Sequence, residues 1–110
     1  MANTTLFDAE IKALHLGDMC LVSIEWKGQN SPNLQIVLER TSLSVSLLFT
    51  WVNKLSIHLR TFGPMTWDVT FARTPDGRWG VLFDFASAGV IEFECEEIIS
   101  CTDDDKSFAS

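Results

Sequence analysis

Three glutamates alternate with apolar residues near the carboxy-terminal end of the chain. On a β-strand, Glu92, Glu94 and Glu96 would leave one face at intervals of ~6.8 Å, twice the rise per residue. Residues 84–105 contain eight of the fifteen acidic residues and neither Lys nor Arg. Because a field of one sign steers association with a partner of opposite sign, we expect these glutamates and Asp84 to bind a basic protein. A solvated face that only maintains solubility is the alternative interpretation.

The side chains that catalysis most often uses are scarce. His15 and His58 are the only histidines, tyrosine is absent, and the sequence contains neither a nucleophile elbow nor a glycine-rich phosphate loop. His58 falls on the polar side of its predicted strand and should be exposed, whereas His15 shares the parity of apolar neighbours and should be partly buried. Cys20 could form a catalytic pair with either histidine only if the fold brought the two side chains together. The sequence predicts a protein that is not an enzyme and has no cofactor.

The three cysteines are Cys20, Cys95 and Cys101, an odd number without paired spacing. This pattern argues against a disulfide framework and predicts reduced thiols, with Cys20 and Cys95 facing the core. No Cys-x-x-Cys or His-x-x-x-His pair accompanies them, so no metal site is expected. The acidic run at residues 103–105 lacks the Gly and Glu of a calcium loop and is typical of a solvated tail.

Composition and length restrict the remaining possibilities. The 110 residues, 46% of them hydrophobic, are enough for one domain, which we expect at residues 1–101 with a flexible acidic tail at 102–110. The net charge of -7 repels a phosphate backbone, so nucleic acid is not an expected partner. The longest strongly apolar stretch, 45–52, is far shorter than the ~20 residues of a membrane-spanning helix. With no signal peptide visible, a cytoplasmic location is expected.

Alternation of apolar and polar residues predicts β-strands along most of the chain. The fold class is therefore mainly β, or α+β with one short helix, as an antiparallel meander that forms a twisted open sheet or a barrel-like sheet. An eighth strand is possible at residues 11–16. The seven segments with the clearest alternation are 20–26, 34–39, 43–51, 55–60, 66–71, 79–85 and 91–96.

Three connections carry their own predictions. The sequence Thr74-Pro75-Asp76-Gly77 has the residue types of a tight turn and predicts a hairpin. A second tight hairpin is expected at residues 53–54, between the strands at 43–51 and 55–60. Residues 6–16 are ambiguous, since Asp8 is a candidate helix cap, but the alternation that follows favours a strand with a bulge or a short helical start.

Several apolar residues fall opposite the predicted core-facing set. A packed helix, a barrel-like curl or a partner subunit in a homo-oligomer would cover them, whereas isolated exposed apolar residues need no explanation. These residues form the alternative contact surface if the glutamates do not bind a partner. Its members are Leu21, Val37, Leu48 and Leu82. Val90 also falls opposite the predicted core-facing set.

Two segments resemble a known family. Residues 6–11, Leu-Phe-Asp-Ala-Glu-Ile, and residues 91–98, Ile-Glu-Phe-Glu-Cys-Glu-Glu-Ile, are similar to segments of the small β-rich immunity proteins of bacterial polymorphic-toxin systems. The usual aromatic-His-Asp-Ala-Glu opening of that family lacks its His here. The resemblance implies a cytosolic antidote that binds and blocks a toxin, and many such toxins are basic nucleases.

Two functions of different classes follow from the sequence. The first is a non-enzymatic acidic binding protein, an immunity protein or comparable inhibitor, that binds a basic protein. The alternative is a β-barrel whose Trp and Phe side chains line a cavity for an apolar small molecule.

Overall fold

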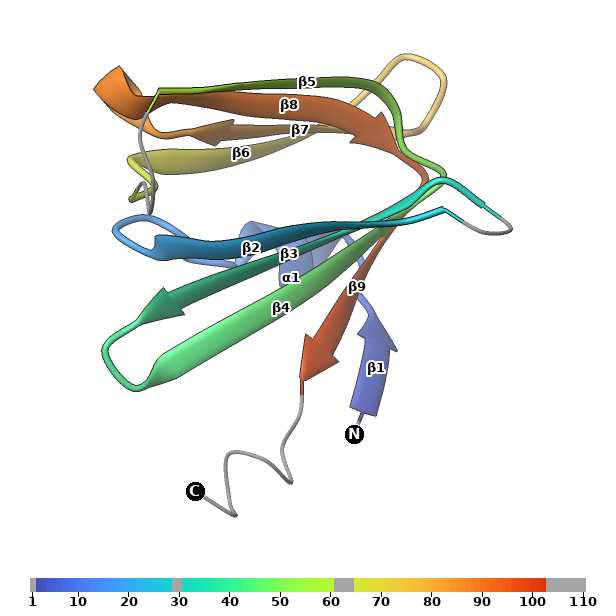
Figure 1. Cartoon of the computed structure of the whole chain (residues 1–110). Coiled ribbons are helices and arrows are strands. Elements are labelled where there is room, and N and C mark those ends of the chain that lie inside the picture. The colour runs from blue at the N-terminus through green and yellow to red at the C-terminus, as the bar shows by residue number, and fades with distance from the viewer. Residues whose placement is uncertain (1, 29–30, 61–64, 103–110) are drawn as a thin grey trace.

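Two antiparallel β-sheets pack face to face in this protein, and one short α-helix lies at their side (Figure 1). The computed structural model describes residues 2–28, 31–60 and 65–102. The mainly β antiparallel fold class is therefore confirmed. In chain order the elements are β1 (Ala2–Thr5), α1 (Asp8–Lys12), β2 (Cys20–Lys27), β3 (Asn33–Arg40), β4 (Leu43–Thr50), β5 (Asn53–Leu59), β6 (Asp68–Arg73), β7 (Trp79–Asp84), η1 (Ala86–Ala88), β8 (Gly89–Cys95) and β9 (Glu97–Thr102).

The strands divide into sheet A, in the order β1-β9-β4-β3-β2, and sheet B, in the order β5-β8-β7-β6. The chain passes between them twice at one corner, from β4 to β5 and from β8 to β9. There the Glu96 N–H donates to the Thr50 carbonyl at 2.8 Å, and Val52 is buried. The hairpin predicted at residues 53–54 is therefore wrong. Trp51, with φ of 51°, and the buried Val52 carry the chain into the other sheet instead.

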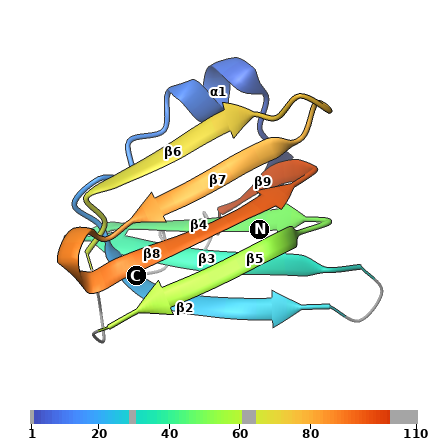
Figure 2. The same cartoon turned by 90° about the horizontal axis from the view of Figure 1, so that it is seen from above.

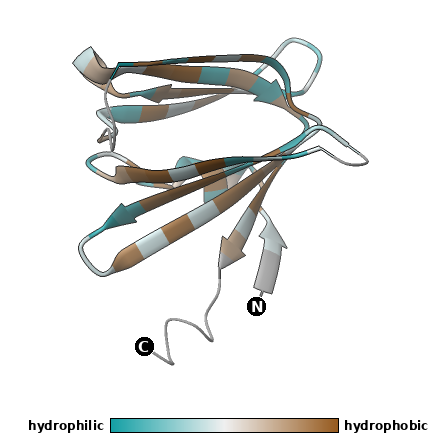
Figure 3. Cartoon of the chain, viewed as in Figure 1, coloured by the Kyte–Doolittle hydropathy of each residue, from teal (hydrophilic) through white to brown (hydrophobic). Residues whose placement is uncertain are grey.

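Alternation along the strands builds the core between the sheets, as the hydropathy colouring shows (Figure 3). Phe49 of sheet A meets two rings of sheet B. Its centroid lies 4.8 Å from that of Phe93 and 6.1 Å from that of Phe83, both in edge-to-face geometry. All three side chains are buried, and burial of each stabilises the fold by roughly 1.5–3 kcal/mol. These rings hold the two sheets together.

A bulge in β2 changes which of its side chains face the core, compared with the prediction from alternation. The register against β3 is interrupted between Leu21 and Ser23, so Val22 adds one residue to the strand. As a result Leu21 and Ile24 both face the core, and Val22 is 51% exposed. The prediction that Cys20 faces the core is therefore wrong, because Cys20 lies half-buried on the other side of the strand.

Residues 8–12 form the helix α1, so the short helical start expected in residues 6–16 is confirmed and the strand expected there is wrong. The Phe7 N–H donates to the Glu10 Oε1 at 2.9 Å, which satisfies a backbone donor at the start of the helix. Asp8 is the first helical residue and not the cap. Ile11 is buried, and Figure 2 shows α1 beside β6, where it covers one open side of the sandwich.

The predicted turn at Thr74–Gly77 is confirmed. The Gly77 N–H donates to the Thr74 carbonyl at 3.0 Å, and Gly77 has the left-handed φ of 85° that glycine adopts without strain. The Arg78 N–H donates to the Thr74 Oγ1 at 2.9 Å. This network joins β6 to β7.

Two strands were not predicted. The segment expected as one final strand at 91–96 is β8, and the chain then continues as β9, which pairs with β4 and β1. The predicted acidic tail lies outside the described residues from residue 103 on. Of the helices in residues 2–28, 31–60 and 65–102, none has the length and apolar character needed to cross a membrane.

Candidate functional site

The outer face of sheet B brings most of the predicted acidic residues together. Along β8 the side chains of Ile91 and Phe93 point into the core, so those of Glu92 and Glu94 point outward. Glu92 lies between Ser56 of β5 and Leu82 of β7 in the sheet register. We call this surface the acidic face, formed by Lys54, Ser56, His58, Asp68, Thr70, Ala72, Gly80, Leu82, Asp84, Val90, Glu92 and Glu94.

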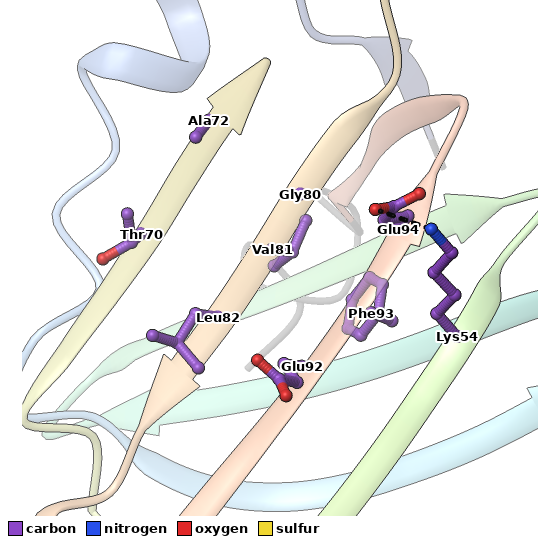
Figure 4. A pocket seen from close by; sticks show the side chains of 9 residues that line it. All are labelled: Lys54, Thr70, Ala72, Gly80, Val81, Leu82, Glu92, Phe93 and Glu94. Atoms are coloured by element: carbon purple, nitrogen blue, oxygen red, sulfur yellow. Dashed lines mark ion pairs between the residues drawn. The ribbon is translucent and has the colours of Figure 1, made fainter. Parts of the chain in front are cut away.

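A depression of about 400 Å³ hollows the acidic face (Figure 4). Gly80 and Ala72 lie opposite each other on β7 and β6 and carry almost no side chain, so the sheet is bare there. Leu82 and Thr70 line the depression on one side, and Glu92 and Glu94 line it on the other. The depression thus combines an apolar floor with a carboxylate rim.

Lys54 is the one basic residue that lines the depression. The register of β5 against β8 shifts between Asn53 and Ser56, and Lys54 has a φ of 55°. Its ammonium group lies 3.6 Å from the Glu94 carboxylate, as the dashed line in Figure 4 marks. Among the described residues no ion pair reaches Glu92, which is exposed. Glu92 is therefore the carboxylate of the rim that can accept a new cation.

Two aspartates add to the negative charge. Asp68 and Asp84 lie directly opposite each other in the β6–β7 pair, an arrangement that is unfavourable for like charges. The Asp84 Oδ1 accepts a hydrogen bond of 2.8 Å from the Ala86 N–H, so it also orders the turn into η1. Asp84 thus has a structural role in addition to its charge.

Glu96 does not belong to the acidic face. It lies after the end of β8, at the corner where the chain enters sheet A, and its carboxylate is 3.9 Å from the Arg78 guanidinium. The prediction of a stripe of three glutamates is therefore correct for Glu92 and Glu94 and wrong for Glu96. The change of sheet, which alternation alone does not indicate, is the reason.

The four residues of the alternative apolar surface do not lie on one face of the molecule. Leu21 is buried in the core because of the bulge in β2. Val37 and Leu48 lie half-buried on the outer face of sheet A, and Leu82 lies on the outer face of sheet B. Leu48 pairs instead with Ile99 of the unpredicted strand β9.

The cysteines and histidines differ from one another in burial. Burial raises the pKa of the Cys95 thiol to about 12, as expected for the core position predicted for it. Burial also raises the pKa of Cys101. His58 is exposed as predicted, but His15 is exposed too, because it follows the end of α1 in a loop. No disulfide joins the three cysteines, and within the described ranges no three His, Cys, Asp or Glu side chains are grouped to hold a metal ion.

The residues that sequence reasoning missed are those that shape the depression. Gly80 and Ala72 have the parity of the outer face, and this parity was readable in the sequence. Their opposition across β6 and β7 depends on the hairpin register, which follows from the turn at Thr74–Gly77. Lys54 was expected in a turn, but it lies two residues before Ser56, the residue of β5 opposite Glu92, and its ammonium group contacts Glu94.

Comparison with known proteins identifies no family for this chain. No protein-family model matches the sequence, no curated protein matches it, and no solved structure matches its fold.

Proposed function

We propose that this chain is a cytoplasmic, non-enzymatic binding protein that captures a basic protein partner on its acidic face. The observation that carries the proposal is the depression, with Glu92 exposed at its rim, a bare floor at Gly80 and the apolar side chain of Leu82 beside that floor. Arginine and lysine have aliphatic stems that pack on apolar surface and cationic heads that bind carboxylates. One such side chain of the partner fits both halves of this surface.

An immunity protein or a comparable inhibitor is the biological role that we propose for this surface. The support is the excess of acid in the chain, with a net charge of -7, and the concentration of Asp68, Asp84, Glu92 and Glu94 on one face. A basic toxin would be steered to such a face before the contacts form. The resemblance of residues 6–11 and 91–98 to immunity proteins points to the same role.

Two observations favour binding over the alternatives. The space between the sheets, where an apolar ligand would have to lie, is filled by Phe49, Phe83 and Phe93. The buried thiol of Cys95 is held protonated by its raised pKa, and thiolate is the nucleophilic form of cysteine. We therefore propose neither an interior ligand nor thiol catalysis.

The test uses a hexa-arginine peptide as the probe and isothermal titration calorimetry at low salt. Glu92→Gln should weaken binding about twofold to fivefold, because an exposed ion pair contributes roughly 0.2–1 kcal/mol. Gly80→Leu should weaken it as well, since the new side chain fills the depression. A Cβ at Gly80 would lie 3.6 Å from the Ala72 carbonyl, which is ordinary contact, so the fold should tolerate the change.

A variant that should strengthen binding complements the two that should weaken it. Lys54→Ala should strengthen binding, because it removes a cation and releases the Glu94 carboxylate from its ion pair. Glu39→Gln is the matched control, since Glu39 is an exposed glutamate of β3 on sheet A. If Glu39→Gln weakens binding as much as Glu92→Gln, or Lys54→Ala weakens it, the acidic face is not the binding site.

A further inference from the structure

The strand β2 ends sheet A on one side, and apart from the isolated bridge between Cys20 and Met65 its outer backbone edge is paired with no strand of the described residues. From Ser23 to Lys27 its register against β3 runs without interruption. A regular edge of this kind presents a row of N–H and C=O groups that can accept another strand. The bulge at Val22 limits the regular part to these five residues and to Gly28 after them.

The side of the sandwich at this edge is also apolar. On β2, Val22 and Trp26 are each 51% exposed, and on β5, Leu55 and Ile57 are 37% and 44% exposed. Figure 2 shows β2 and β5 on the side opposite to α1. The helix buries Ile11 on its own side, so one open side of the sandwich is covered and the other is not.

The charges on β2 make this edge complementary to itself. Glu25 and Lys27, the neighbours of Trp26 in the sequence, both lie on the outer face of sheet A, and their charged groups are 3.5 Å apart. Trp26 lies on the other face of the strand, opposite the buried Leu34. If two copies pair antiparallel about a two-fold axis at Trp26, each Glu25 lies opposite Lys27 of the other copy. Moving the two-fold axis to Glu25 shifts the register by two residues and would place Glu25 opposite Glu25, which is unfavourable. The charges therefore select one register.

We propose that two copies of this chain form a symmetric dimer through β2, which joins their A sheets into one continuous sheet. The indole rings of the two Trp26 residues form the central cross-strand pair, and Leu55 and Ile57 of β5 are covered from the same side. The acidic face belongs to sheet B and takes no part in this contact. The dimer is thus independent of the proposed function.

Sedimentation velocity over a concentration series tests the proposal with single charge reversals. Glu25→Lys and Lys27→Glu should each weaken the dimer about tenfold, because each turns two opposite-charge pairs into like-charge pairs. An equimolar mixture of the two variants should restore dimers, since every pair then has opposite charges again. Loss of the ion pair within one chain cannot produce that restoration. Glu39→Lys on β3 is the matched control and should leave the dimer unchanged.

Amide hydrogen exchange of the wild-type protein gives a second readout that needs no variant. The amides of β2 should exchange more slowly at high protein concentration than at low concentration, whereas those of β7 should not change. A wild-type chain that stays monomeric throughout, a mixture that fails to restore dimers, or β2 amides that do not respond to concentration would each overturn the proposal.

Discussion

Thr66 closes the end of the sandwich opposite to the corner where the chain changes sheets, and its replacement by valine gives a sharp test of the fold. The side chain is 1% exposed. Its hydroxyl donates to the Leu16 carbonyl and accepts from the Met19 N–H at 3.0 Å. Leu16 and Met19 are buried as well. Valine keeps the shape of threonine and removes both hydrogen bonds.

The magnitude follows from these contacts. Each buried backbone group left without a partner costs about 1–3 kcal/mol, and the added methyl group returns at most about 0.8 kcal/mol. With partial relaxation of the loop before β2, we expect Thr66→Val to lower the free energy of unfolding by about 2 kcal/mol. The backbone bonds of Thr66 to Met19 and Asp18, both 2.8 Å, remain. The variant should therefore still fold.

Urea unfolding followed by tryptophan fluorescence measures the effect. At a slope of roughly 1–3 kcal/mol per M, the midpoint should fall by about 1 M with the slope unchanged. Thr70→Val is the matched control, because Thr70 is exposed on β6 and the same change of atoms there should alter stability by less than about 0.5 kcal/mol. Equal midpoints for Thr66→Val and the wild type would refute this account of the loop.

Three further predictions concern titration and backbone geometry. The raised pKa of Cys95 means that the unfolded chain loses the thiol proton near pH 9 while the folded chain keeps it. Stability should therefore fall as pH rises from 9 toward about 12, by up to ~1.4 kcal/mol per unit, and Cys95→Ala should flatten this slope in denaturant unfolding. The hydrogen bond from Arg73 lowers the pKa of Asp8, so this pair contributes stability above the unfolded pKa of 3.8 that is lost as pH falls further. The stability difference between the wild type and Asp8→Asn should accordingly vanish in acid, and a difference that persists there would contradict this assignment. Gly89→Ala should abolish folding, because the new Cβ would lie 1.8 Å from a carbonyl oxygen of β5. At Gly77 a Cβ would meet no atom within 4 Å, so Gly77→Ala should lower the free energy of unfolding by only about 1 kcal/mol, as thermal unfolding can measure.

The mainly β fold was predictable because each half-buried strand alternates, and the turn at Thr74–Gly77 was predictable from its residue types. The division into two sheets was not. Alternation shows which side chains share a face, but the crossing at Val52 depends on which sheet the next strand joins. β9 was missed because Ile98 faces the core and Ile99 faces outward, so both parities are apolar there.

The candidate site shows the same limit. Glu92 and Glu94 were predicted to share a face because they are two residues apart on one strand. Glu96 has the same spacing, but the strand ends before it. The depression arises where Gly80 and Ala72 meet across two strands, and Leu21 became a core residue through a single inserted residue in β2. Register and bulges are decided by packing of the whole sandwich, which no local pattern contains.

Nuclear magnetic resonance mapping of the hexa-arginine peptide on the isotope-labelled protein tests directly whether the acidic face is the binding site. We expect the amide signals of Gly80, Leu82 and Glu92 to shift during the titration, and we expect these shifts to disappear in the Glu92→Lys variant. Added salt should weaken the effect, because exposed charges are screened beyond about 8 Å at physiological ionic strength. Shifts centred on Glu25 and Glu39 of sheet A, with the acidic face unchanged, would show that the peptide binds elsewhere.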